Sequence, residues 1–215
     1  MTDRKLIKVC GMTEGENIRA VEALGVDLIG FIFYPRSPRF ARSVPSYLPE
    51  RAGRVGVFVD SGYDEIMLLR DEFGLEYAQL HGAEPPEFCE RLRRAGLRVI
   101  KAFGIGPAGD GLPAADSGYA EACDLYLFDT RSAGYGGSGR AFEWEALRHY
   151  SERVPFFLSG GVGPDSVISI EHIENDMFVG VDLNSRFELS PGVKDVASLA
   201  AFIESLTYRN TLDNK

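Results

Sequence analysis

Eight short runs of β-branched and aromatic residues, separated by longer amphipathic stretches, most constrain the fold of this chain. Runs of this length and composition are typical of buried strands. Their alternation with helix-like stretches indicates parallel strands joined by crossover helices. The expected strands are Leu6–Cys10, Leu28–Phe33, Arg54–Val59, Tyr77–Leu80, Arg98–Phe103, Leu125–Phe128, Phe156–Ser159 and Phe178–Asp182.

The clearest helix-like stretches carry recognisable ends. One ends at Gly25, and another begins at Pro85-Pro86 and ends at Gly96, as helix caps do. The short Pro-rich stretch before Arg54 favours a helix only weakly, and Gly104–Gly118 is expected to be mostly loop. The expected helices are Glu16–Leu24, Asp64–Glu72, Pro86–Ala95 and Ser198–Leu206.

The chain length favours a closed barrel. Eight strand–helix units in 215 residues average about 27 residues each, and a barrel of this kind needs about 200 residues at least. We therefore expect a single (β/α)8 TIM barrel of the α/β class over residues 1–207, with a frayed tail over 208–215. The alternative is an open doubly wound sheet, which should carry a Gly-rich fingerprint after its first strand; that strand ends Cys10-Gly11-Met12-Thr13.

Composition excludes several classes of function. A net charge of −9 argues against a nucleic-acid partner, because neutralising phosphates needs clustered Lys and Arg. No apolar stretch approaches the ~18 residues of a membrane span. The three cysteines form no CxxC pair, which argues against a metal site, and their odd number without a secretion signal predicts reduced thiols in the cytoplasm. Cys89 and Cys123 are expected to be structural.

Polar residues close five of the expected strands. The active site of this barrel class lies at the carboxyl ends of its strands, so these residues should meet at one rim. Because side chains alternate along a strand, Lys8 shares a face with Cys10, and Gln79 shares one with His81. The strand-end residues are Cys10, His81, Asp129, Ser159 and Asp182.

A thiol and a carboxylic acid can divide acid–base work. Cys10 is a base when a nearby cation such as Lys8 lowers its pKa, and Asp129 is an acid when partial burial raises its own. The sequence leaves open which group takes which role. It also allows structural roles: Cys10 as a buried apolar residue, Asp129 as a turn former, His81 as a hydrogen-bonded residue, and Asp182 as a residue that orients a loop.

Three loops that follow expected strands carry further candidate functional residues. Gly160 and Gly161 follow the seventh strand, where backbone N–H groups and a helix N-terminus can bind phosphate; a plain turn is the alternative. Arg36 and Arg39 follow the second strand and could bind a carboxylate or phosphate, or form only a solvated basic loop. The glycine-rich stretch Gly134–Gly139 suits a mobile flap.

Together these segments resemble the phosphoribosylanthranilate isomerase family of tryptophan biosynthesis. Singly several are weak, but they occur in the family's order and cover nearly the whole chain. They are Lys8-Val9-Cys10-Gly11-Met12-Thr13, Gly30-Phe31-Ile32-Phe33-Tyr34-Pro35 with Ser37-Pro38-Arg39, Val55-Gly56-Val57-Phe58-Val59, Gln79-Leu80-His81-Gly82, Phe128-Asp129-Thr130, Tyr135-Gly136-Gly137-Ser138-Gly139, Leu158-Ser159-Gly160-Gly161, and Pro191-Gly192 before Lys194-Asp195.

The resemblance implies an Amadori rearrangement of N-(5'-phosphoribosyl)anthranilate to 1-(2-carboxyphenylamino)-1-deoxyribulose 5-phosphate, with no cofactor and no metal. It implies that Asp129 is the general acid that opens the ribose ring, that Cys10 is the general base at C2, and that Arg39 faces the anthranilate carboxylate. The partner would be this phosphorylated small molecule, and the protein a monomer or homodimer. The expected substrate-binding residues are Lys8, Arg39, His81, Gly160, Gly161, Asp182, Ser185 and Arg186.

One position departs from the family pattern. After Asp182 a run of small residues, Ser-Ser-Gly-like, is expected, but the chain has Asn184-Ser185-Arg186-Phe187-Glu188. Losing a glycine at Arg186 could change how backbone donors meet the phosphate. Our hypothesis is that the Arg186 guanidinium adds a phosphate contact.

Two other functions compete with this one. The aminoaldose isomerase of histidine biosynthesis runs the same chemistry, but it typically uses paired carboxylates and has a strong half-barrel repeat, whereas Cys10 stands on the first strand here and the halves show no clear repeat. A catalytically silent barrel retained as a scaffold has no need to keep both Cys10 and Asp129. A turnover assay separates the three.

Overall fold

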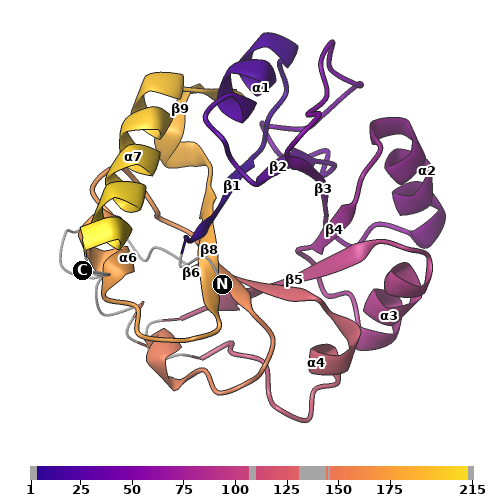
Figure 1. Ribbon diagram of the computed structural model, residues 1–215. Coiled ribbons are helices and arrows are strands. Elements are labelled where there is room, and N and C mark those ends of the chain that lie inside the picture. Colours follow the sequence, from indigo (N-terminus) through magenta and orange to yellow (C-terminus); the bar gives the residue numbers. More distant parts are fainter. Residues whose placement is uncertain (1–3, 107–109, 131–143, 145, 213–215) are drawn as a thin grey trace.

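A computed structural model describes residues 4–106, 110–130, 144 and 146–212. Eight parallel strands close into a barrel in which every strand pairs with its neighbours in sequence and the eighth pairs with the first (Figure 1). The strands are β1 (Leu6–Cys10), β2 (Leu28–Ile32), β3 (Gly53–Phe58), β4 (Tyr77–Leu80), β5 (Arg98–Ile105), β6 (Leu125–Thr130), β7 (Phe156–Ser159) and β8 (Phe178–Leu183).

The predicted strands are confirmed, each within two residues at either end. They were recognisable because both faces of a parallel barrel are buried, which makes each strand a nearly continuous apolar run. The β8–β1 pairing excludes the open sheet, since an open sheet leaves its edge strands unpaired. This pairing sets Lys8 opposite Asp182, and the β1–β2 pairing sets Cys10 opposite Gly30.

Helices surround the barrel on its outside, and the first and last of them lie side by side (Figure 1). The connection between β2 and β3, residues 33–52, contains no helix. The helix that the sequence weakly favoured before Arg54 was therefore wrong, and Pro45 and Pro49 disfavour a helix in this stretch. The helices are α1 (Gly15–Glu22), α2 (Tyr63–Phe73), α3 (Pro86–Arg94), α4 (Tyr119–Ala122), α6 (Val167–Glu171) and α7 (Val196–Leu212), with 3-10 turns η1 (Ala146–His149) and η2 (Ser185–Phe187).

The last helix is longer than the sequence suggested. The expected stretch Ser198–Leu206 lies within α7, whose backbone is helical as far as Leu212. The expected domain boundary at 207/208 therefore falls inside this helix and not at its end. Fraying over 208–215 stays a prediction.

Two apolar layers build the molecule. The larger lies between the strands and the helices and includes Cys89 and Cys123, both buried as free thiols. The smaller fills the barrel interior with side chains such as Ile100, Leu127 and Phe157. Because the interior is filled, the barrel is not a pore, and the polar site lies at the carboxyl ends of the strands. Within the described residues, no helix has both the length and the apolar character needed to cross a bilayer.

Candidate active site

A pocket opens at the carboxyl ends of the strands, and most of the predicted site residues line it. They come from β1, β4, β6, β7 and β8 and from the turns that follow, as expected for this barrel class. All of them except Lys8 and Arg39 border the pocket: Cys10, His81, Asp129, Gly160, Gly161, Asp182, Ser185 and Arg186. Cys10 and Asp129 therefore share one cavity although 119 positions separate them in the sequence (129 − 10).

Lys8 lies beneath the pocket and not on its wall. Its side chain is fully buried, and Nζ donates a hydrogen bond of 2.7 Å to Asp182 Oδ1. Burial acts to lower the pKa of Lys8, but Asp182 and Cys10 outweigh it and raise the pKa. Asp182 also accepts a hydrogen bond of 3.2 Å from Ser159 Oγ, so both carboxylate oxygens are oriented by neighbouring strands.

Cys10 is buried, and only 3% of its surface is exposed. Burial raises the pKa of its thiol; Lys8 and Lys194 act in the opposite direction but do not overcome it. The expected effect of Lys8 is thus present, yet the effect of desolvation on the thiol is larger. Space for the sulfur comes from β2: a Cβ built on Gly30 would lie 2.8 Å from Cys10 Sγ.

Asp129 faces His81 across the pocket mouth. His81 Nε2 lies 3.4 Å from Asp129 Oδ2, and each side chain is about a third exposed, at 36% and 35%. On its other side, His81 Nδ1 lies 3.3 Å from Gln79 Nε2. The imidazole of His81 thus lies between the Gln79 amide and the Asp129 carboxylate.

Gln79 is a pocket residue that the predicted site did not include. It is 1% exposed, and its Oε1 has no hydrogen-bond partner among the residues that the structure describes. Its alternation with His81 in the sequence had placed it on the right face, but a glutamine in a strand gives no signal of catalysis by itself.

The loop after β7 has the backbone that its sequence suggested. Gly160 and Gly161 adopt φ of 78° and 70°, a left-handed conformation that favours glycine. The following helix, α6, has only five residues, and the Gly163 N–H is taken by Ser166 Oγ at 2.9 Å. The N–H of Gly163 is therefore engaged within the loop itself.

Arg186 lies across this loop. A Cβ built on Gly163 would be 3.0 Å from Arg186 Nε, and Arg186 Nη2 lies 3.5 Å from Asp165 Oδ1. Ser185 and Arg186 belong to η2, directly after β8. The residue that departs from the family pattern thus borders the pocket beside the glycine pair.

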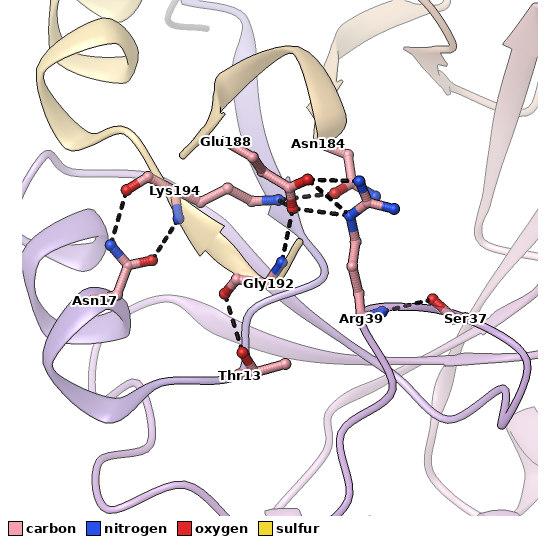
Figure 2. A network of polar contacts seen from close by, with 8 residues as sticks. All are labelled: Thr13, Asn17, Ser37, Arg39, Asn184, Glu188, Gly192 and Lys194. Carbon is pink, nitrogen blue, oxygen red and sulfur yellow. Dashed lines mark hydrogen bonds and ion pairs between the residues drawn. The ribbon is translucent and has the colours of Figure 1, made fainter. Parts of the chain in front are cut away.

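Arg39 lies beside the pocket in a buried polar cluster (Figure 2). Its Nε donates to Glu188 Oε1 at 2.8 Å, and its Nη2 donates to Glu188 Oε2 at 2.5 Å. Lys194 Nζ donates to the same carboxylate at 2.6 Å and to Asn184 Oδ1 at 2.7 Å. Arg36, the second guanidinium expected in this loop, is exposed and does not line the pocket.

Glu188, Lys194 and Asn184 are site residues that the sequence prediction missed. Glu188 and Asn184 stood in the run that departs from the family pattern, and Lys194 stood in the matching segment from Pro191 to Asp195; none of the three was given a role. Burial acts to raise the pKa of Glu188, but Arg39 and Lys194 hold it below its usual range.

The glycine-rich stretch Gly134–Gly139 lies outside the described residues. In the part of the chain that the structure describes, no group of three or more His, Cys, Asp or Glu side chains is arranged to hold a metal ion.

Comparison with known proteins gives one consistent family. A family model described as N-(5'phosphoribosyl)anthranilate (PRA) isomerase matches residues 7–205. An N-(5'-phosphoribosyl)anthranilate isomerase from Phocaeicola vulgatus is 48% identical over 204 residues, which cover 95% of this chain and 98% of the relative.

Solved structures agree. Phosphoribosyl anthranilate isomerase from Thermotoga maritima superposes with a TM-score of 0.75 at 32% identity, over 95% of this chain and 99% of that one. A structure of the isomerase in complex with reduced 1-(o-carboxyphenylamino)-1-deoxyribulose 5-phosphate gives 0.71 at 27% identity, over 95% and 99%. Monomers generated from the dimeric Thermotoga maritima isomerase give 0.67 at 27% identity, over 94% and 98%.

The closed barrel, the shared pocket of Cys10 and Asp129, and a family match that spans nearly the whole chain point to the same conclusion. The chain belongs to the N-(5'-phosphoribosyl)anthranilate isomerase family.

Proposed function

We propose that this protein catalyses the Amadori rearrangement of N-(5'-phosphoribosyl)anthranilate in tryptophan biosynthesis, by general acid–base catalysis. The observation that carries the proposal is that a thiol and a carboxyl group, Cys10 and Asp129, border one pocket whose rim also holds the Gly160–Gly161 loop. A solved relative of the same fold carries a reduced form of the expected product. The chemistry divides naturally between these groups.

Asp129 is the general acid. It gives its proton to the ribose ring oxygen while the bond from that oxygen to C1 breaks, which opens the sugar to a protonated Schiff base. His81, whose Nε2 lies 3.4 Å from Asp129 Oδ2, orients the carboxyl group and stabilises it once the proton has left.

Cys10 is the general base. Its thiolate removes the proton from C2, and the electron pair of that C–H bond moves toward the iminium nitrogen to give an enolamine, which tautomerises to the ketone. The Schiff base is itself the electron sink, so the reaction as proposed needs neither metal nor cofactor. Each proton-transfer group contributes roughly 10²–10⁴-fold, and positioning supplies more.

Phosphate and carboxylate are held at separate places. Gly160, Gly161 and Ser185 offer backbone and hydroxyl donors to the phosphate, with Arg186 beside them. Arg39 binds the anthranilate carboxylate. The hydrogen bond between Lys8 and Asp182 fixes the orientation of Asp182, which lines the pocket.

We further propose a cytoplasmic enzyme that is a monomer or a homodimer. The dimeric form described for the Thermotoga maritima relative supports the second option. The acidic net charge of −9 agrees with a small-molecule substrate and not with nucleic acid.

The decisive experiment follows the decay of substrate fluorescence with the wild-type protein, Cys10→Ala and Asp129→Asn. We expect the wild type to turn over and each variant to lose most of kcat while still binding the reduced product. A correctly folded wild type without turnover would rule the proposal out and leave the silent scaffold. Turnover of the histidine-pathway aminoaldose instead would favour that alternative.

A further inference from the structure

We propose that Glu188 and Lys194 are positioning residues that turn Arg39 into a carboxylate-specific subsite. This inference rests on the proposed function and deepens it, because it names what makes the enzyme discriminate an aniline that carries a carboxylate from one that does not. Glu188 aims the guanidinium, and Lys194 supplies the positive charge that Glu188 would otherwise cancel.

The orientation of Arg39 is set by Glu188. The carboxylate takes one edge of the guanidinium, through Nε and Nη2, and leaves Nη1 for another anion. Figure 2 shows this remaining edge pointing away from Glu188. The Glu188 side chain is 5% exposed and that of Arg39 is 18% exposed, so the pair is largely shielded from water. The two-point contact restricts rotation of the guanidinium about its own stem. A guanidinium held in this way loses little further freedom on binding.

Glu188 is in turn held from three sides. The Gly192 N–H donates to Oε1 at 3.1 Å, Lys194 Nζ donates to the same oxygen at 2.6 Å, and Arg39 completes the set. Lys194 is tied to α1, since its N–H donates to Asn17 Oδ1 at 2.7 Å and its carbonyl accepts from Asn17 Nδ2 at 2.9 Å. The cluster thus spans the loop after β2, helix α1 and the short strands β9 (Glu188–Ser190) and β10 (Val193–Lys194).

Charge counting separates the two roles. Arg39 and Glu188 alone form a neutral pair, which has little net attraction for an incoming anion. The Lys194 side chain is fully buried, and its ammonium group donates to acceptor oxygens of Glu188 and Asn184. Burial lowers the pKa of Lys194, while the hydrogen bond and charge of Glu188 act in the opposite direction. With its ammonium group held by these acceptors, the cluster carries one positive charge in excess, which a substrate carboxylate neutralises in surroundings where charge interactions are strong.

The cluster also lies close to the proposed catalytic base, Cys10. A Cβ built on Gly11 would be 2.7 Å from Arg39 Cδ and 3.0 Å from Asn184 Oδ1, so both side chains pack over the residue that follows Cys10. Asn184 itself lines the pocket. A carboxylate bound here would place the aniline ring beside the C2 proton that Cys10 removes.

The test measures binding of two reduced product analogues that differ only in the ring carboxylate: 1-(2-carboxyphenylamino)- and 1-anilino-1-deoxyribitol 5-phosphate. Competition by inorganic phosphate measures binding at the phosphate end of the pocket, beside Gly160 and Gly161. We expect the wild type to prefer the carboxylated analogue by about tenfold or more, as for one desolvated charge-assisted contact. Lys194→Met removes the charge in excess and should reduce that preference to about threefold or less, with the affinity for inorganic phosphate unchanged. The double variant Glu188→Gln/Lys194→Met keeps one positive charge in excess, on Arg39, but loses the carboxylate that aims it, and it should show the same reduced preference.

Two controls separate positioning from structure. Lys194→Arg keeps the charge and should restore most of the preference. In an Arg39→Ala background, Lys194→Met should cause no further loss, because the group that contacts the carboxylate is already gone. The double variant Glu188→Gln/Lys194→Met, which removes the buried carboxylate together with its lysine, serves as the second variant if Lys194→Met does not fold.

The inference is overturned if Lys194→Met keeps the full preference, or if phosphate affinity falls by the same factor as carboxylate affinity. Failure of the proposed function looks different: the wild type would not turn over substrate, whatever its preference between the analogues.

Discussion

Lys8 Nζ donates a hydrogen bond to Asp182 Oδ1 across 2.7 Å inside the barrel, between side chains that are 0% and 5% exposed. The two residues are 174 positions apart and face each other only because β8 pairs with β1. A buried ion pair of this kind adds little stability over apolar residues of the same shape, but removing one partner leaves an uncompensated charge. The Lys8–Asp182 ion pair beneath the pocket can therefore form only when the barrel is closed.

Lys8→Met should destabilise the fold by about 3–5 kcal/mol, because Asp182 then remains buried without its cation. The measurement is urea unfolding followed by circular dichroism. The matched control is the double variant Lys8→Met/Asp182→Leu, which should recover part of the loss since no isolated charge remains. A double variant as unstable as the single one would mean that the pair does more than satisfy its own charges.

Activity should rise with pH through the neutral range and into the alkaline range. The base must be the thiolate, and burial raises the pKa of Cys10, so at lower pH the group stays protonated and kcat/KM falls. Lys8 acts to lower this pKa, so Lys8→Met should move the rising limb to still higher pH. The rate of alkylation by iodoacetamide, measured against pH with Cys10→Ala as the blank, reports the thiolate directly. An apparent pKa below the ordinary range of a cysteine would contradict the assignment of Cys10 as a buried base.

Gly30→Ala should lower kcat by about tenfold or more, because a Cβ there would lie 2.8 Å from Cys10 Sγ and displace the thiol. Stability should fall by about 1–3 kcal/mol from overpacking. Gly62→Ala is the control, since a Cβ at Gly62 meets nothing within 4 Å. Combining Gly30→Ala with Cys10→Ala should restore stability, as the clashing sulfur is gone; no restoration would place the strain elsewhere.

Arg186→Ala should raise the KM of the phosphorylated substrate by about fivefold, as expected for a partly exposed ion pair, with kcat nearly constant. Arg186→Lys should keep part of the affinity, because it retains a point charge without the planar fork. Inhibition by inorganic phosphate gives an independent readout. An unchanged KM in Arg186→Ala would refute the added phosphate contact and leave Arg186 as a partner of Asp165 only.

The sequence alone located the strands, because each is a compact apolar run and both faces of a parallel barrel are buried. It also located the ends of α3, where Pro86 and Gly96 act locally. It placed Cys10 and Asp129 at strand ends and so at one rim. These features depend on residues close together in the chain, which is why pattern and spacing were sufficient.

Tertiary structure decided what each charge does. Lys194 stands in a two-residue strand and looks like a surface lysine, yet its side chain is fully buried against Glu188, and Glu188 holds Arg39 from 149 positions away. Likewise the effect of Lys8 on Cys10 is outweighed by burial, which no local pattern reports. The physical reason is the same in both cases: the energy of a charge depends on how much water it has lost and which distant groups replace that water, and only the closed barrel sets those two quantities.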